Sequence, residues 1–125
     1  MTKQDILELV DETEMPQIRA GETHRFNDIW IVEVEGRLFC RQYDFAERSW
    51  YHAFRHDPRG AIKCGDKVIR VRGVVPDDLD DLNPRINEAY LEKYAKRFTT
   101  YPHYAREMTG PRFMQRTLEL VPETD

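Results

Sequence analysis

Cysteine is scarce in this sequence of 125 residues, and neither of the two cysteines belongs to a CxxC pair. Cys40 and Cys64 are therefore expected to be reduced, small core residues, and a disulfide between them is the less favoured alternative. Long apolar runs are also missing, since no stretch approaches the ~20 apolar residues that a membrane-spanning helix needs. Residues 1–5 are polar and form no signal-peptide core, which predicts a cytoplasmic protein.

Neither sign of charge dominates the composition. The chain has 23 acidic and 19 basic residues, for a formal net charge of -4. This balance gives no general attraction to nucleic acid or to an anionic membrane, so we expect neither as a partner. The length and the 40% of apolar residues predict one domain over residues 1–125 with a sizeable core.

Familiar catalytic motifs are absent. The sequence contains no GxSxG, P-loop, GxGxxG or HExxH pattern, which argues against classical hydrolases and zinc proteases. His52 and His56 are spaced i, i+4 and would share one face of a helix, where they could hold a divalent metal. Because the sequence places no third ligand beside them, we predict no metal site.

The clearest β signal lies between His24 and Tyr43, on both sides of Glu35-Gly36. A hairpin turning at this dipeptide places Val32 opposite Phe39 and Trp30 opposite Arg41. Both faces of such a hairpin are partly apolar. We therefore expect a barrel interior on one face and either a helix or a second subunit on the other.

The other elements follow from capping and turn residues. A helix begins after the Thr2 and Asp5 capping box and ends before Pro16. The remaining expectations are a short helix from Ser49 to near Pro58, a hairpin of residues 60–64 and 67–75, a helix from Asn83-Pro84 to near Phe98, a loop from Thr99 to Arg112 and a strand from about Met114 to Val121. The sum is an α+β fold with a small antiparallel barrel or strongly bent sheet.

Arg41 is the first candidate site residue, because the hairpin register places it beside Trp30 and Phe39 on an apolar face. A buried guanidinium needs a partner, either an internal carboxylate or a bound anion such as phosphate. In the alternative interpretation, Arg41 stands at the strand end and reaches solvent or pairs with Asp44 or Glu47.

Ser49, Trp50 and Tyr51 place a hydroxyl and two large aromatic rings at the start of a helix. Backbone N–H groups can receive an anion there, and an aromatic ring can stack on a planar ligand, although such rings more often anchor a core. The sequence allows Arg41, Ser49 and a strand cation such as Arg72 to meet at one phosphate.

Two further groups have a functional and a structural interpretation. One is a cationic set in the second hairpin, which is either part of a site or a solvated sheet face: Lys63, Arg70 and Arg72. The other lies in the 99–112 segment and could donate hydrogen bonds or move a proton near a planar substrate, or could simply pack: Tyr101, His103, Tyr104 and Arg106.

Several segments, taken in order over residues 16 to 122, resemble a small uncharacterised bacterial family of the flavin-binding split-barrel superfamily. They are Trp30–Val34, Leu38–Arg41, Trp50-Tyr51, the second hairpin, Ala89–Tyr94 and Thr117–Pro122. That superfamily also contains deazaflavin-dependent nitroreductases and pyridoxamine phosphate oxidase-like proteins. Asp57-Pro58 stands where the deazaflavin-dependent relatives have an Asn-Pro turn.

The resemblance implies a six-stranded antiparallel split β-barrel with flanking helices, commonly a homodimer. It also implies a flavin mononucleotide or deazaflavin cofactor held in a cleft. The first functional hypothesis is an oxidoreductase acting on a small planar molecule, with Arg41, Ser49 and Arg72 at the cofactor phosphate and Trp50 or Tyr51 at the ring. The alternatives are a cofactor-free protein that binds or transforms a small molecule, with His52 or His103 moving protons, and a non-catalytic dimeric module.

Overall fold

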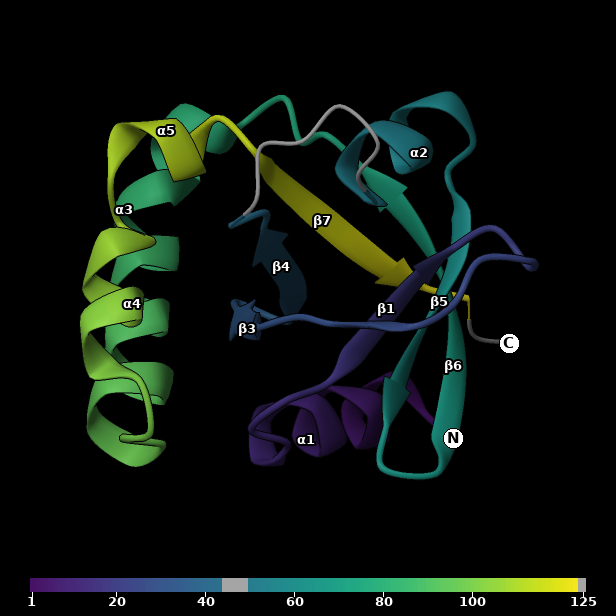
Figure 1. The fold of residues 1–125 in the computed structure, drawn as a ribbon, viewed down its shortest axis with the longest axis horizontal. Helices are drawn as coiled ribbons and strands as arrows, with labels where there is room; N and C mark the ends of the chain where they lie inside the picture. The colour runs from purple at the N-terminus through teal and green to yellow at the C-terminus, as the bar shows by residue number, and fades with distance from the viewer. Residues whose placement is uncertain (44–49, 124–125) are drawn as a thin grey trace.

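The computed structural model describes residues 1–43 and 50–123, which form an antiparallel sheet flanked by helices (Figure 1). The strands are β1 Gln17–Ala20, β2 Asn27–Asp28, β3 Ile31–Val34, β4 Arg37–Arg41, β5 Arg59–Cys64, β6 Lys67–Val74 and β7 Thr117–Pro122. The helices are α1 Lys3–Glu12, α2 Trp50–His56, α3 Leu79–Leu91, the π-helix η1 Glu92–Arg97, α4 Pro102–Glu107 and α5 Pro111–Met114. The α+β class is confirmed.

The sheet has the strand order β2-β1-β5-β6-β7-β4-β3, so β2 and β3 are its two edges. Only Ile29 and Trp30 separate these edge strands in the chain. The three peptide units from Asp28 to Ile31 reach at most ~11 Å, so the sheet must curl until its edges approach each other. The result is a half-barrel of seven strands within the described residues, compared with the six expected from the resemblance.

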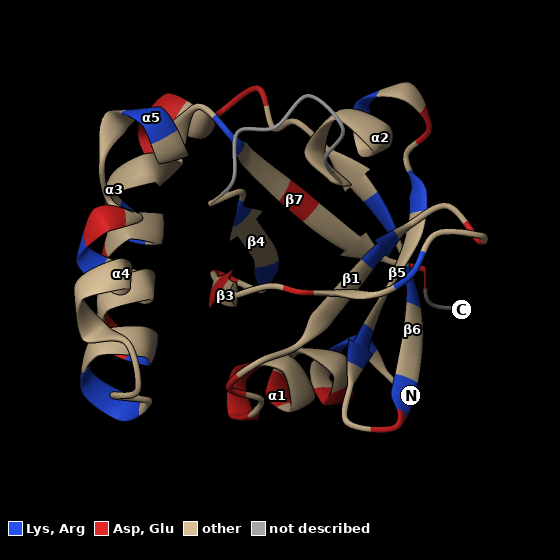
Figure 2. Ribbon diagram, in the orientation of Figure 1, with Lys and Arg blue, Asp and Glu red and all other residues tan. Residues whose placement is uncertain are grey.

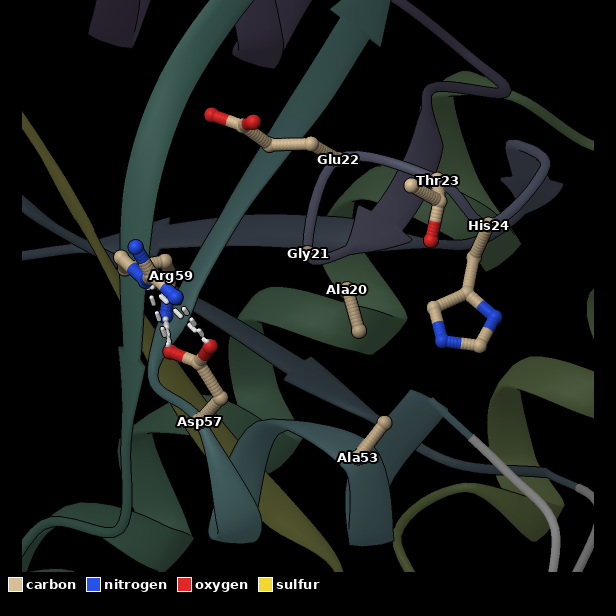
Figure 3. A pocket seen from close by; sticks show the side chains of 8 residues that line it. All are labelled: Ala20, Gly21, Glu22, Thr23, His24, Ala53, Asp57 and Arg59. Carbon is tan, nitrogen blue, oxygen red and sulfur yellow. Dashed lines mark hydrogen bonds and ion pairs between the residues drawn. The ribbon is translucent and has the colours of Figure 1, made fainter.

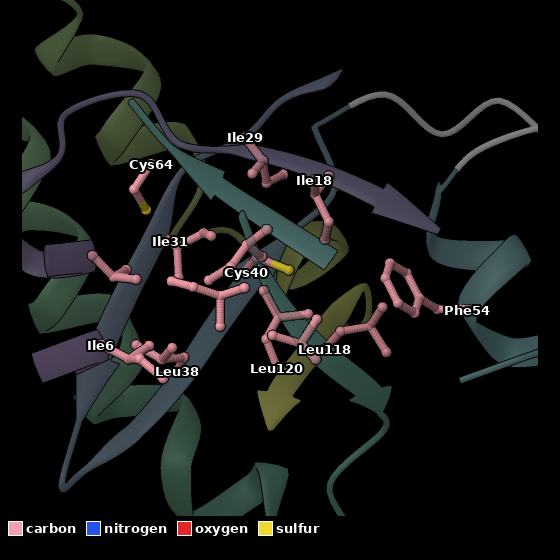
Figure 4. Packing of buried hydrophobic residues seen from close by; sticks show 14 of the residues in the cluster. Ile6, Ile18, Ile29, Ile31, Leu38, Cys40, Phe54, Cys64, Leu118 and Leu120 are labelled. Carbon is pink, nitrogen blue, oxygen red and sulfur yellow. The ribbon is translucent and has the colours of Figure 1, made fainter. Parts of the chain in front are cut away.

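The concave side of the curled sheet holds the main core (Figure 4). Ile18, Ile62 and Ile69 lie in one row across β1, β5 and β6, and Cys40 and Cys64 are buried in the same cluster as free thiols. This confirms the interpretation of both cysteines as core residues. Helices α1 and α2 add further apolar side chains to the cluster: Ile6, Leu7, Val10, Tyr51 and Phe54.

The convex face of the β3–β4 hairpin forms a second core. Val32 and Phe39 are opposite each other in the predicted register, and both are at most 1% exposed. They pack with Leu82, Ile86 and Tyr90 of α3. A helix therefore covers the face that the sequence offered to either a helix or a second subunit. The homodimer remains a prediction.

Both hairpin registers agree with the sequence analysis. In the second hairpin, Ile62 pairs with Ile69 and Cys64 with Lys67, with Gly65 at a φ of 63° in the turn. Positive φ values favour glycine, which is why this turn was recognisable. The predicted capping box of α1 is also present, with Thr2 and Asp5 bonded reciprocally.

The start of α3 differs from the prediction. The helix begins at Leu79 rather than at Asn83-Pro84, and Pro84 lies inside it. Burial of Leu82 in the second core favours the earlier start, and acidic residues in a first helical turn interact well with the helix dipole. The buried leucine outweighs the hydrogen bond that the proline cannot donate.

The 99–112 segment was wrongly predicted to be a loop, because it contains α4 and the start of α5. Each of these helices has a proline at its start, where the missing N–H costs nothing. Ala105 and Met108 then pack into the second core. The final strand starts at Thr117, because Met114 belongs to α5.

On the exposed side of the helical layer, Glu92 forms an ion pair with Arg97 at 3.0 Å. These two residues lie in the π-helix η1, which brings residues five apart into line.

Helix α2 is seated on the sheet through two glycines. The ring of Phe54, 2% exposed, lies over Gly60 of β5 and Gly73 of β6. A Cβ atom at position 73 would stand 2.4 Å from Phe54 Cδ1, and one at position 60 would stand 2.5 Å from the same ring. Only glycine leaves room for this contact, so both positions fix the place of α2.

Gly73→Ala is expected to displace Phe54 and to lower the free energy of unfolding by about 2 kcal/mol, as overpacked core substitutions do. Urea denaturation of the variant tests this, with the exposed neighbour Val74→Ala as the control. Equal stability of Gly73→Ala and the wild type would show that α2 is not anchored in this way.

Candidate functional site

Arg41 is fully buried between the sheet and the helical layer. Its Nε donates to Thr117 Oγ1 at 3.0 Å, and its Nη atoms donate to Met108 O at 2.7 Å and to the side-chain oxygens of Asn83 and Asn87. All four acceptors are neutral, and burial lowers the pKa of the guanidinium. Within the described residues, neutral oxygens therefore occupy the donors for which the sequence suggested a carboxylate or an anion. Asp44 and Glu47, the carboxylates suggested for the strand end, lie outside the described residues.

Tyrosine and lysine side chains reinforce the same junction. Tyr90 Oη accepts from Arg41 N at 2.9 Å and donates to Trp30 O at 3.2 Å, so it bridges the predicted Trp30 and Arg41 pair. Lys93 Nζ donates to Val10 O and Ile31 O. These bonds tie α3 and η1 to the β3–β4 hairpin and to α1.

The structure does not bring Arg41 and Arg72 together. Arg41 pairs with Thr117 at one end of β7, and Arg72 pairs with Val121 near the other end. Four residues of strand separate these positions by roughly 13 Å, and two strand spacings add to that. The Arg41 donors also point under α3, so the two guanidinium groups do not converge on one phosphate.

Arg41→Met is expected to leave the oxygens of Asn83, Asn87 and Met108 without a donor. The loss should reach about 3 kcal/mol of unfolding free energy, the scale of a broken buried charge interaction. Chemical denaturation measures it, with exposed Arg72→Met as the control that should stay near the wild type. A stable Arg41→Met variant would contradict the structural role.

Lys93 gives a pH-dependent prediction. Burial lowers its pKa from 10.5 to about 8. Between these values the unfolded chain binds more protons at this residue than the folded chain, so its contribution to stability rises with pH. Burial also raises the pKa values of Tyr90 and Tyr94, which opposes this trend at high pH.

Comparison with Lys93→Met isolates the lysine. The wild type should gain stability relative to the variant between pH 8 and pH 10.5, by about 3 kcal/mol at most. Urea denaturation of both proteins at each pH gives this difference. A difference that does not change with pH would show that the Lys93 ammonium is not destabilised by burial.

The predicted aromatic residues lie on α2, and Ser49 lies outside the described residues. Tyr51 is 5% exposed and donates its hydroxyl to Gln115 O, so its ring belongs to the core. Trp50 is partly buried at the edge of that core. Because residues three apart share a helix face, Trp50 and Ala53 lie on the same side of α2.

The predicted proton-transfer histidines lie on different helices, His52 on α2 and His103 on α4. His52 Nε2 lies 2.8 Å from a guanidinium nitrogen of Arg116, which fixes that ring nitrogen as an acceptor. His103 is exposed on α4 and its ring lies 4.1 Å from that of Tyr104. Across the described ranges, no three His, Cys, Asp or Glu side chains are grouped to hold a metal ion.

A pocket of about 290 Å³ lies between α2 and the connection from β1 to β2 (Figure 3). Ala20 and Ala53 form an apolar wall, while Thr23 and His24 bring polar groups to the opposite side. Small side chains on the wall leave space for a flat ring. Trp50 stands one helical turn from Ala53, so its indole lies on the same side of α2 as this pocket.

An ion pair forms the third side of the pocket. Asp57 accepts two hydrogen bonds from Arg59 Nε and one from Nη2, and the latter is 2.8 Å long. These bonds lower the pKa of Asp57 to about 2. Asp57 therefore balances much of the charge of Arg59, and a further anion needs other cations.

A second hollow, of about 330 Å³, adjoins the first and shares Gly21, Glu22 and Arg59 with it. It lies on the convex face of β1, β5 and β6, which none of the helices in residues 1–43 and 50–123 covers (Figure 1). Basic residues gather on these three strands (Figure 2). In sequence order they are Arg19, Arg59, Lys63, Lys67, Arg70 and Arg72.

Sequence reasoning found part of this surface and missed the rest. The alternation in the second hairpin indicated Arg70 and Arg72, both of which are exposed. Arg19 and His24 were missed, because β1 has only four residues and too little alternation to identify its faces. The signal available in the sequence was a cation at position 19 between two apolar residues, Ile18 and Ala20.

Residues 6–120 match the model of a protein family described as "Uncharacterized protein conserved in bacteria (DUF2255)". The chain belongs to this family. The match spans nearly the whole described fold, so family membership covers the half-barrel and the helical layer alike. A comparison with curated proteins gives no match.

Two solved structures share the fold at low sequence identity. One is a Listeria innocua protein provisionally named as a pyridoxamine 5'-phosphate oxidase, with a TM-score of 0.61, 10% identity, and 98% of this chain and 94% of that chain covered. The other is a conserved hypothetical protein of Mycobacterium tuberculosis, with a TM-score of 0.54, 12% identity, and coverage of 99% and 80%. These likenesses are consistent with the expected split-barrel fold.

In residues 1–43 and 50–123, no helix combines the length and the apolar character needed to cross a membrane.

Proposed function

We propose that this protein binds flavin mononucleotide or a deazaflavin and uses it to oxidise or reduce a small planar molecule. The observation that supports this most directly is the pocket between α2 and the β1–β2 connection, in a fold shared with a protein provisionally named as a pyridoxamine 5'-phosphate oxidase. When bound, such a cofactor supplies hydride transfer, while the protein supplies orientation and electrostatics.

The residues of the pocket fit a planar ring. Ala20 and Ala53 offer a flat apolar wall, and the indole of Trp50 extends the same side of α2. His24 and Thr23 can hydrogen-bond to the polar edge of a ring. The volume of about 290 Å³ is near the lower limit for small-molecule sites, and the adjoining hollow extends it.

The pair of Asp57 and Arg59 would orient the ligand at the boundary of the two hollows. Asp57 holds Arg59 against the rim by hydrogen bonds to Nε and Nη2, so its guanidinium is pre-ordered before a ligand arrives. Pre-ordered groups lose less conformational entropy on binding. Asp57 thus has a defined role at the position where the relatives resembled by this sequence have asparagine.

Trp50 makes the proposal measurable, because the chain has only two tryptophans. The other, Trp30, stacks on Tyr94 with the ring centres 4.2 Å apart. Trp30 packs against the second core, whereas Trp50 and Ala53 pack against the main core. Titration with flavin mononucleotide, flavin adenine dinucleotide and a deazaflavin should give saturable quenching of tryptophan fluorescence by one of them. The quenching should disappear in Trp50→Phe and persist in Trp30→Phe.

Binding by equilibrium dialysis provides the second measurement for each variant. Trp50→Phe should retain weakened binding, because phenylalanine still offers a smaller stacking surface. If the wild type binds none of the three cofactors, the flavin chemistry is removed from the pocket, and a cofactor-free protein becomes the favoured hypothesis.

A further inference from the structure

The convex face of β1, β5 and β6 holds two guanidinium groups on either side of a small residue. In the sheet register, Arg19 of β1 lies opposite Ala61 of β5, and Ala61 lies opposite Arg70 of β6. Directly opposed residues share a face of a sheet, so the three side chains stand in one row. Because the side chain of Ala61 is a single methyl group, the row leaves a hollow of about 330 Å³ with an arginine on each side.

Arg19 has donor capacity that the protein does not use. Its Nε is buried and has no hydrogen-bond partner, while its guanidinium lies 4.5 Å above the ring of Phe26. Buried polar atoms nearly always have partners, so an orphaned donor beside a hollow indicates a missing acceptor. The Phe26 ring contacts one face of the guanidinium and accepts none of its hydrogen bonds at Nε.

Arg70 is only weakly engaged. Its ion pair with Glu22 spans 3.9 Å, and both side chains are 77% exposed. Exposed pairs of this kind contribute little and exchange easily for a better partner. Arg59, by contrast, is held by Asp57, so the cations available in the row are Arg19 and Arg70.

The surrounding charge is mixed but remains favourable to an anion. The acidic residues that line the hollow are Glu22 and Glu123. Lys63 lies 5.8 Å from the centre of the Phe26 ring, and Arg72 is opposite Arg59 in the sheet. These flanking cations add positive charge at the margins of the hollow, next to Arg19 and Arg70.

We infer that Arg19 and Arg70 form a phosphate-monoester site in the hollow above Ala61. A phosphate offers several oxygen acceptors and up to two negative charges, which suits two arginines that face a common space. The inference rests on the proposed function for the rest of the ligand: the phosphate of a flavin would occupy this hollow while its ring occupies the adjoining pocket. The two hollows meet at Gly21, Glu22 and Arg59.

Isothermal titration with flavin mononucleotide and with riboflavin tests the site, because the two ligands differ only in the phosphate. The wild type should bind flavin mononucleotide at least about tenfold more tightly, since one charged hydrogen bond is worth that much. Arg19→Gln and Arg70→Gln should each remove most of this difference and leave riboflavin affinity unchanged. Exposed Arg85→Gln on α3 is the matched control.

The outcomes separate the two proposals. Equal affinity for both ligands, unaffected by either glutamine substitution, would overturn the phosphate site and leave the flavin pocket in place. If neither flavin binds, while inorganic phosphate binds the wild type and not Arg19→Gln or Arg70→Gln, the phosphate site stands and the flavin function fails. Absence of all binding would overturn both. Thermal denaturation of each variant establishes that it is folded.

Discussion

The helical layer depends on the buried guanidinium of Arg41, whose four side-chain hydrogen bonds all go to neutral oxygens. Its partners come from β7, from two residues on one face of α3, and from the end of α4. Three separate elements are therefore held to β4 by a single side chain. Leaving such a guanidinium unpaired in the interior would be costly, so the four contacts must form together. This requirement fixes α3 and α4 on the β3–β4 side of the sheet.

The helical layer covers the convex face of β3 and β4 and leaves the convex face of β1, β5 and β6 exposed. The seven-stranded sheet curls because its edge strands are joined by two residues, and its concave side is filled by isoleucines, leucines and two cysteines. The helices α3, η1 and α4 pack on β3 and β4, while the convex face of β1, β5 and β6 exposes cations. The arginines are thus divided: Arg41 stabilises the fold, and Arg19 and Arg70 remain available for a ligand.

The sequence predicts the hairpins well and their surroundings poorly. Strand pairing has a period of two, and glycine marks each turn, so the registers around Gly36 and Gly65 follow from local residues. The partners of Arg41 are 42 to 76 positions away in the chain, and no local pattern contains them. Prolines also misled the prediction, since Pro84 was interpreted as a helix start although Leu82 is already buried within α3.

The candidate site shows the same limit. Trp50 shares one face of the short helix α2 with the pocket residue Ala53, and the cationic face of the second hairpin was recognised from its alternation. The row of Arg19, Ala61 and Arg70 could not be predicted, because it exists only once β1 pairs with β5. Ala61 matters because its small side chain lies between the two arginines in the sheet. The sequence alone does not show that Ala61 is next to either of them.

The central claim is that Arg41 stabilises the fold while Arg19 and Arg70 bind the ligand. Amide chemical-shift mapping by NMR tests it most directly, with flavin mononucleotide added to the labelled protein. The ligand should perturb the amides of Gly21, Gly60 and Ala61, next to the two hollows, and leave those of Arg41 and Asn87 unchanged. Perturbations centred on Arg41 and Asn87 would contradict the assignment and place the ligand under the helical layer.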